Sequence, residues 1–156
     1  MLVKVVFLFT LLAYSIIVSQ SFMYILALKN VQFTLEANSF IELRKLIDVN
    51  MRDNFKYPVY AALFTSLLMV ILTLKNPTSL LFITVAIAFI ALIADTLLMM
   101  KGNLPINDVI NTWSADNFPK NWSEYRAKWF TVFQYRQIAN IIGFVSLLIG
   151  AVFGSK

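Results

Sequence analysis

Two charged residues stand inside long apolar stretches of the chain, and both are of types that can do chemistry. Asp95 lies five residues before Met100, at the end of one stretch, and Arg136 lies at a similar distance inside the next. A charge at the centre of a membrane helix costs about 2.5–3.5 kcal/mol on insertion scales, so such residues mark pairing or function. Antiparallel neighbouring helices would bring both charges to one depth. We predict an ion pair, and the candidate catalytic residues are Asp95 as general base and Arg136 as stabiliser of an oxyanion.

Further polar and aromatic side chains share the level of this pair. Trp129 precedes Arg136 by one heptad, and Asn140 follows it by one helical turn. Gln20 and Tyr24 lie near the end of the first apolar stretch, on the same predicted side of the membrane. The pattern predicts a polar pocket with an aromatic wall, and its candidate ligand-binding residues are Gln20, Tyr24, Trp129 and Asn140. The alternative is that the ion pair only sets the register of two helices and binds nothing.

Small residues support the same register. Ala88 and Ala91 share a helix face with Asp95, and Gly143 shares one with Arg136. Small side chains let helix backbones approach closely in lipid. We therefore expect Ala88 to face Gly143, seven residues deeper than the charged pair.

The composition excludes several kinds of site. The chain has no Cys and no His, which excludes disulfides, Cys/His zinc sites, haem ligated by His or Cys, and Ser-His-Asp or Cys-His catalysis. A metal would need Asp, Glu, Asn or Tyr oxygens, and only Asp95 lies at depth. We expect neither a metal nor a cofactor.

The elements that must position these residues are membrane helices. Of the 156 residues, 60% are hydrophobic and 13% are charged, and the mean hydropathy is +0.76. A soluble domain carries about 25% charged residues, so a water-soluble globule is excluded. A span needs about 20 apolar residues, and such stretches cover residues 5–28, 57–74, 80–100 and 131–153. The predicted fold is an all-α membrane protein, a single domain forming an antiparallel four-helix transmembrane bundle.

The first stretch has a second interpretation, because one Lys, an apolar run and small polar residues also resemble a secretory signal. The apolar run continues as far as Leu28, past a plausible cleavage point, so we expect a retained first helix.

The connections are unequal in length. Residues 75–79 predict a tight turn, whereas the two long connections lie together on the other side of the membrane. In the first, Ser39 and Glu42 read as a capping box for an amphipathic helix over residues 39–54. Its apolar face is predicted to be Phe40, Leu43, Ile47 and Met51, and its polar face Glu42, Arg44, Lys45, Asp48 and Arg52. In the second, Pro105 suits the first turn of a short helix over residues 105–115. We expect both helices to lie at the membrane interface.

The net charge of +5 bears on orientation rather than on nucleic acid, for which we expect no binding. Before Arg136 is counted, nine basic residues lie on the long-connection side and three on the other. Because cytoplasmic loops are enriched in Lys and Arg, the long connections are predicted to be cytoplasmic, in a bacterial inner (plasma) membrane.

The segment over residues 101–136 resembles the signature of a known family. Gly102, Pro105 and Asn107 match a G-x-x-P-x-N motif after the third span, and Trp122, Arg126, Trp129 and Arg136 match a Trp/Arg pattern that opens the fourth helix. The stretch from Ser39 to Pro58 is similar to the family's first loop. The chain thus resembles the anthrone-oxygenase-like group of small four-helix membrane proteins, catalogued mainly as a domain of unknown function. Some members carry a His where this chain has Phe133 and Tyr135.

The resemblance implies further site residues and a reaction. Within the matching segment, the added candidate ligand-binding residues are Asn103, Asn107, Trp122 and Arg126. Family members named for activity are thought to oxidise polycyclic anthrones without metal.

Three functions remain open at this point. The first is cofactor-independent oxygenation, and the second is binding of a quinone-like, aromatic or lipid-like molecule without turnover. The third is a structural or accessory role beside a protein partner in the bilayer. A channel is disfavoured, because no span carries a continuous polar stripe.

Overall fold

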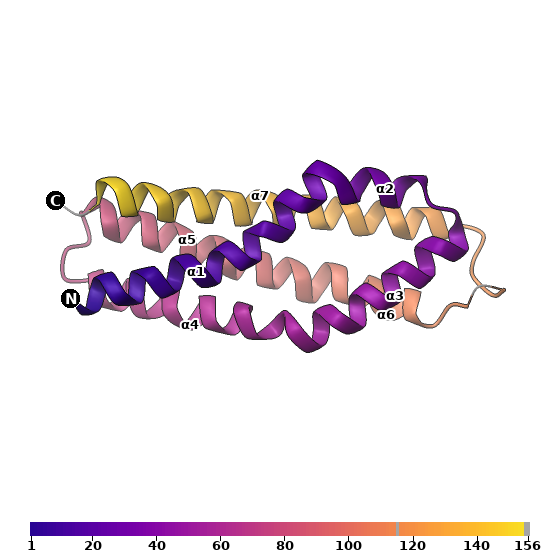
Figure 1. Ribbon diagram of the computed structural model, residues 1–156, viewed down its shortest axis with the longest axis horizontal. Helices are drawn as coiled ribbons and strands as arrows, with labels where there is room; N and C mark the ends of the chain where they lie inside the picture. Colours follow the sequence, from indigo (N-terminus) through magenta and orange to yellow (C-terminus); the bar gives the residue numbers. More distant parts are fainter. Residues whose placement is uncertain (115, 155–156) are drawn as a thin grey trace.

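The computed structural model describes residues 1–114 and 116–154, and these residues form an elongated bundle of helices (Figure 1). Its elements are α1 (Leu2–Met23), the π-helical η1 (Tyr24–Leu28), α2 (Lys29–Thr34), α3 (Ala37–Asn54), α4 (Lys56–Thr73), α5 (Leu80–Leu98), the π-helical η2 (Met99–Asn103), α6 (Leu104–Asn111) and α7 (Trp122–Phe153). In the described residues, four helices are long and apolar enough to span a membrane. The predicted all-α membrane fold is confirmed.

The helices extend well beyond the predicted spans. Residues Leu2–Thr34 and Leu80–Asn111 each form one continuous helix through a π-helical turn. At about 1.5 Å per residue, the 32 residues of α7 exceed a hydrocarbon core of about 30 Å. One end of the bundle must therefore project out of the hydrocarbon, and in Figure 1 this is the end opposite both termini, formed by α2, α3, α6 and the start of α7.

The predicted second short helix is therefore the end of a longer one. It begins at Leu104 directly after η2 and ends at Asn111 rather than at residue 115, which lies outside the described residues. Pro105 lacks the N–H that an α-helix would bond to Lys101. The widened π-helical turn directly before it accommodates this missing bond, so the helix continues.

The first amphipathic helix is present, but its start and its faces differ from the prediction. Glu36 is the N-cap residue of α3, and Ser39 lies inside the helix, so the capping box is wrong. Its buried face includes Arg44 and Asp48, whereas Leu46 is 66% exposed. The reason is that α3 packs along the bundle beside α6 (Figure 1), so its inward face meets protein rather than lipid.

Two apolar cores fill the bundle. The core within the span includes Tyr14, Leu92 and Leu147, and the outer core is aromatic, with Tyr24, Trp129 and Phe133 among its members. Polar side chains gather where the two cores meet.

Within the span, the predicted packing around Gly143 is shifted. A side chain at Gly143 would first meet Tyr14 and Ala91 rather than Ala88. The Tyr14 hydroxyl donates to the Ala88 carbonyl at 3.3 Å. The Tyr14 side chain thus fills the space in which we expected Ala88 and Gly143 to meet directly.

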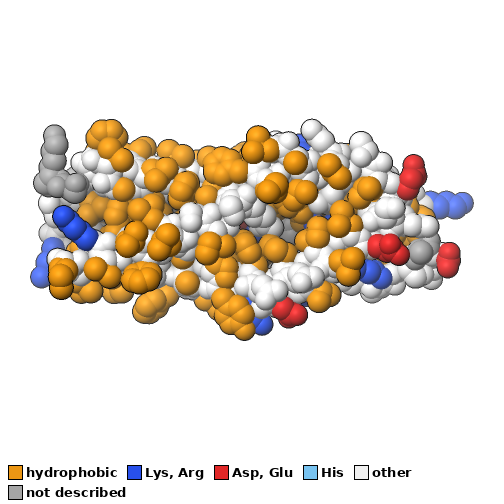
Figure 2. Space-filling view, viewed as in Figure 1, with side chains coloured by type: hydrophobic (Ala, Val, Ile, Leu, Met, Phe, Trp, Pro, Cys, Tyr) orange, Lys and Arg blue, Asp and Glu red, His pale blue; other side chains and the backbone are white. Residues whose placement is uncertain are grey.

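The outer surface of the bundle is largely apolar. Large hydrophobic side chains such as Phe9, Phe64 and Ile90 are more than half exposed. Figure 2 shows hydrophobic side chains along the visible face, with most of its charged ones at the two ends. Such a surface is suited to lipid.

Candidate functional site

The predicted ion pair is formed. Asp95 and Arg136 are 1% and 6% exposed, and Arg136 Nε donates to Asp95 Oδ1 at 2.7 Å. Arg136 Nη1 also donates to Asn103 Oδ1 at 3.2 Å. The Asn103 amide then donates to the Trp129 carbonyl at 3.0 Å. The pair is therefore the inner end of a hydrogen-bonded network that ties α5, η2 and α7 together.

A second carboxylate anchors the outer end of the network. The Trp129 indole donates to Asn107 Oδ1 at 2.8 Å, and the Asn107 amide donates to Asp48 Oδ1 at 2.6 Å. Asp48 also accepts from Asn111 at 2.8 Å and from Arg52 at 2.9 Å. Both of its oxygens are thus occupied by protein donors.

Arg52 joins this outer end to the surface. It bonds Asp48 and also Asp108, the latter at 2.6 Å. Burial alone would lower the pKa of Arg52, but the hydrogen bonds and charges of these two carboxylates outweigh it and raise the pKa. Arg52 is therefore a fully compensated cation.

Arg44 differs, because it is buried without a counter-ion. It is 3% exposed, and among the described residues no carboxylate lies within ion-pair distance of it. Its Nη1 donates to the Tyr24 hydroxyl at 3.1 Å, its guanidinium lies 4.1 Å from the centre of the Trp129 ring, and its Nε is buried without a partner. Burial lowers the pKa of Arg44 against the opposing influence of Tyr24 and Asp48, and the charge of Arg136 lowers it further.

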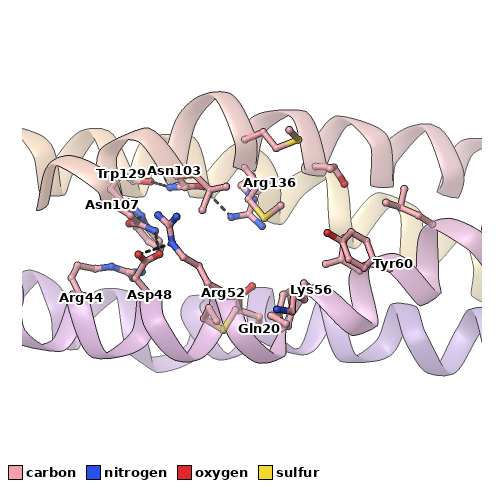
Figure 3. Close-up of a pocket in the computed structure, with 18 residues that line it drawn as sticks. Gln20, Arg44, Asp48, Arg52, Lys56, Tyr60, Asn103, Asn107, Trp129 and Arg136 are labelled. Carbon is pink, nitrogen blue, oxygen red and sulfur yellow. Dashed lines mark hydrogen bonds and ion pairs between the residues drawn. The ribbon is translucent and has the colours of Figure 1, made fainter. Parts of the chain in front are cut away.

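A cavity of about 360 Å³ lies beside this network, between α3 and α4 on one side and α5, η2, α6 and α7 on the other. Figure 3 shows Arg44, Asp48, Asn107 and Trp129 close together at one end of it, with Arg136 directed into it. The polar lining residues are Gln20, Arg44, Asp48, Arg52, Lys56, Thr96, Asn103, Asn107 and Arg136. The apolar and aromatic ones are Met51, Phe55, Val59, Tyr60, Leu63, Met99, Met100, Leu104 and Trp129.

The cavity lies at the level where the chain passes from apolar to charged sequence. Lys56 begins α4 and lines the cavity, and exposed Lys101 follows the lining residue Met100. Lys side chains at helix ends reach toward the membrane interface. Val59 and Leu63 lie on the apolar side of this level and Asp48 on the other, so the cavity crosses it.

Half of the predicted site residues line the cavity. These are Gln20, Asn103, Asn107, Trp129 and Arg136. Asp95 does not line it, since the carboxylate is held by Arg136. Tyr24 supports Arg44 through its hydroxyl, and Asn140 is buried in α7 with its Oδ1 unbonded.

Trp122 and Arg126 belong to a different cluster. The Arg126 guanidinium lies 4.5 Å from the centre of the Trp122 ring and donates to the carbonyls of Gln32 and Leu35, at 3.2 and 2.9 Å. These hydrogen bonds provide donors for two backbone carbonyls, one in α2 and one in its connection to α3. Their role in the structure is to hold that connection against α7.

Sequence reasoning missed the residues that α3 and α4 contribute to the lining. The sequence predicts Arg44 and Asp48 only as part of the polar face of an interfacial helix, and it does not single out Lys56 or Tyr60 as site residues. One signal was present: the apolar residues Leu46 and Val49 fall outside the predicted apolar face of α3, and both are exposed in the structure.

The site contains no arrangement typical of a metal centre, since no group of three or more acidic side chains comes together among the described residues. Comparison with known proteins adds no identity: no family model matches the chain, and neither the curated proteins nor the solved structures include a similar one.

Proposed function

We propose that the protein binds a small aromatic or lipid-like molecule of the membrane in this cavity. The observation that carries the proposal is the cavity itself, which joins a charged, hydrogen-bonded end to an apolar end at the membrane level. Ligand sites of about 300–1,000 Å³ typically combine a mainly apolar wall with a few placed polar groups. A cavity of about 360 Å³ falls at the small end of this range.

The lining suits a flat or flexible apolar molecule. Phe55 offers aromatic surface, and Met51, Met99 and Met100 add polarizable side chains that adapt to irregular shapes. Tyr60 and Met100 are 64% and 57% exposed on the outside of the bundle. A ligand could therefore enter from the bilayer between α4 and η2.

Binding can be tested by filling the cavity. Purified protein in neutral lipid nanodiscs would be incubated with a benzoquinone that carries a ten-carbon chain, and bound ligand would be counted by native mass spectrometry. We expect one ligand per chain. Leu63→Trp, which places a large side chain in the cavity, should abolish binding, and Leu67→Trp, one turn further along α4 and 44% exposed, should not. Equal binding by both variants would contradict the proposal.

Turnover of the ligand is a separate question. Cofactor-independent oxygenation needs a base that reaches the substrate. Asp95 is bonded to Arg136 away from the lining, and Asp48 has both oxygens occupied. This geometry favours binding without turnover.

Measuring oxygen uptake with an oxygen electrode distinguishes binding alone from oxygenation of the ligand. We expect the rate of oxygen uptake from a polycyclic anthrone to be the same with the protein as with its Leu63→Trp variant. Faster uptake that depends on an open cavity and on Arg136 would favour the oxygenase that the family resemblance implies.

A further inference from the structure

We propose that the ligand of this cavity is an anionic amphiphile, whose oxyanion lies between Arg44 and Arg136 and whose apolar part points toward α4 and α5. This proposal rests on the proposed function and specifies its ligand class. It concerns the charge of the ligand, which neither aromatic walls nor cavity size determines.

The first support is the unbalanced charge of Arg44. The nearby carboxylates already have partners: Asp48 is bonded by Arg52 and two asparagines, and Asp95 is bonded by Arg136. A buried cation without a counter-ion is unfavourable, because burial removes its hydration and the neutral groups around it, here Tyr24 and Trp129, supply no opposite charge. An anion bound in the cavity would supply the counter-ion that Arg44 lacks.

The second support is the arrangement of the cations. Arg44, Arg52, Lys56 and Arg136 line the cavity together. Arg52 and Arg136 have carboxylate partners, whereas no carboxylate of the described residues lies within ion-pair distance of Arg44 or Lys56. Guanidinium groups form strong charge-assisted hydrogen bonds with carboxylate and phosphate oxygens. Arg44 Nε is buried and unbonded, so it retains a donor for such an oxygen.

The third support is the direction of polarity. The cations lie on α3, at the start of α4 and on α7, whereas Val59, Leu63 and Thr96 continue the lining into the span. Figure 3 shows Tyr60 on α4 at the other end of the cavity from Arg44 and Asp48. An oxyanion at the interface with its apolar chain below matches this order and the orientation of an acidic amphiphile in a bilayer.

The test compares head groups on one chain. Dodecanoate, dodecyl phosphate and dodecanol would be titrated into the protein in neutral lipid nanodiscs, and binding that Leu63→Trp does not remove would be subtracted. We expect the anions to bind at least about tenfold more tightly than dodecanol, a difference of about 1.4 kcal/mol. Tighter binding of dodecyl phosphate would indicate a phosphate head group, and tighter binding of dodecanoate a carboxylic acid.

Arg44→Met tests whether the charge of Arg44 causes the preference for anions. It removes the charge while keeping an apolar side chain over Trp129, so the anion preference should fall to within about threefold while thermal stability without ligand is kept or raised. Lys101→Gln removes an exposed charge near the same level that does not line the cavity, and it should leave the preference unchanged.

The outcomes separate the two proposals. Cavity-dependent binding with equal affinity for dodecanol and dodecanoate would overturn the anionic ligand and keep the binding function. An anion preference that survives Arg44→Met would also overturn the assignment. Absence of cavity-dependent binding for all three probes and for the quinone would overturn both.

Discussion

At the scale of single residues, the two buried arginines of this protein are in opposite situations. Arg136 has a carboxylate partner at 2.7 Å, and Arg44 has a phenol hydroxyl and an aromatic ring but no carboxylate within ion-pair distance among the described residues. Neutralising Arg136 leaves the Asp95 carboxylate unpaired, whereas neutralising Arg44 removes a buried cation that has no carboxylate partner among the described residues. The two positions should therefore respond to neutralisation in opposite directions.

The ion pair predicts a specific pattern of mutant stabilities. Asp95→Asn should lower the free energy of unfolding by about 3–5 kcal/mol, because it leaves the Arg136 cation uncompensated in the bundle. Asp95→Asn combined with Arg136→Gln should cost less than the single change, since a neutral polar pair remains. Unfolding in mixed micelles with increasing SDS measures both. A double variant that is less stable than the single one would contradict the interpretation.

Arg44→Lys should create a pH dependence. An ordinary lysine has a pKa of about 10.4, and burial at this position disfavours the charged form, as it does for Arg44. Between the lowered folded pKa and 10.4 the unfolded chain binds more protons, so the stability of this variant should rise with pH in that window. Anion binding should fall over the same window, because the cation is lost. Thermal unfolding and dodecanoate titration from pH 7 to 10 measure the two trends, with wild type as the baseline.

At the scale of elements, α3 is attached to α6 through buried polar contacts, which its amphipathic pattern does not predict. Arg44 and Asp48 face inward, and Asp48 accepts from two asparagines of α6. In addition, Lys45 Nζ donates to the Trp113 carbonyl just after α6. The outer end of the bundle thus combines an aromatic core with a hydrogen-bonded seam between α3 and α6.

Asp48→Asn should weaken this seam. An amide oxygen replaces one carboxylate oxygen and an NH2 group replaces the other, so at least one of the donors from Asn107, Asn111 and Arg52 loses its acceptor. We expect a loss of about 1–3 kcal/mol and faster amide exchange in α3 and α6. Glu42→Gln, on the exposed face of α3, is the matched control and should change stability by less than about 0.5 kcal/mol. Equal effects would mean that Asp48 does not hold the two helices together.

At the scale of the whole molecule, the bundle is longer than a bilayer is thick. Its apolar surface includes the part that contains both termini (Figures 1 and 2). Because the helices are longer than a hydrocarbon core, we expect the opposite end, with α3 and α6, to project from the membrane. The cavity lies where these two parts meet. A molecule dissolved in the bilayer and a charged group at its surface can therefore reach the same place.

This arrangement predicts the topology. Because the chain has no cysteine, single cysteines can be introduced at Glu42, Lys120 and Asn76. A membrane-impermeant maleimide should label the first two from one side and the third from the other, since residues 75–79 join the two spans at the opposite end. Labelling of positions 42 and 76 from the same side would contradict the bundle.

The excess of basic residues near the long connections further predicts which side that is. With those connections in the cytoplasm, a reporter that works only outside the cytoplasm should be active when fused to the C-terminus. Activity of a cytoplasm-only reporter there would reverse the orientation.

The sequence by itself determined that four apolar stretches form long helices and that Asp95 and Arg136 lie at one level along them. Hydrocarbon forces the backbone of an apolar stretch into a helix, and a helix rises by a fixed distance per residue. Counting residues from the ends of the spans was therefore enough to bring Asp95 and Arg136 together. Gln20 was also found this way, because it lies near the end of the first span, whereas Asn107 was suggested by the family resemblance.

Only the tertiary structure decided what the charged face of α3 meets. An amphipathic pattern records that two faces differ, but it does not say whether the charged one contacts water or protein. The partners that allow Asp48 to be buried are Asn107 and Asn111, about 60 residues further along the chain, and no local pattern connects them. The same is true of Arg44, whose environment is built by Tyr24 and Trp129 from two other helices. The cavity and its unbalanced charge arise from this long-range packing.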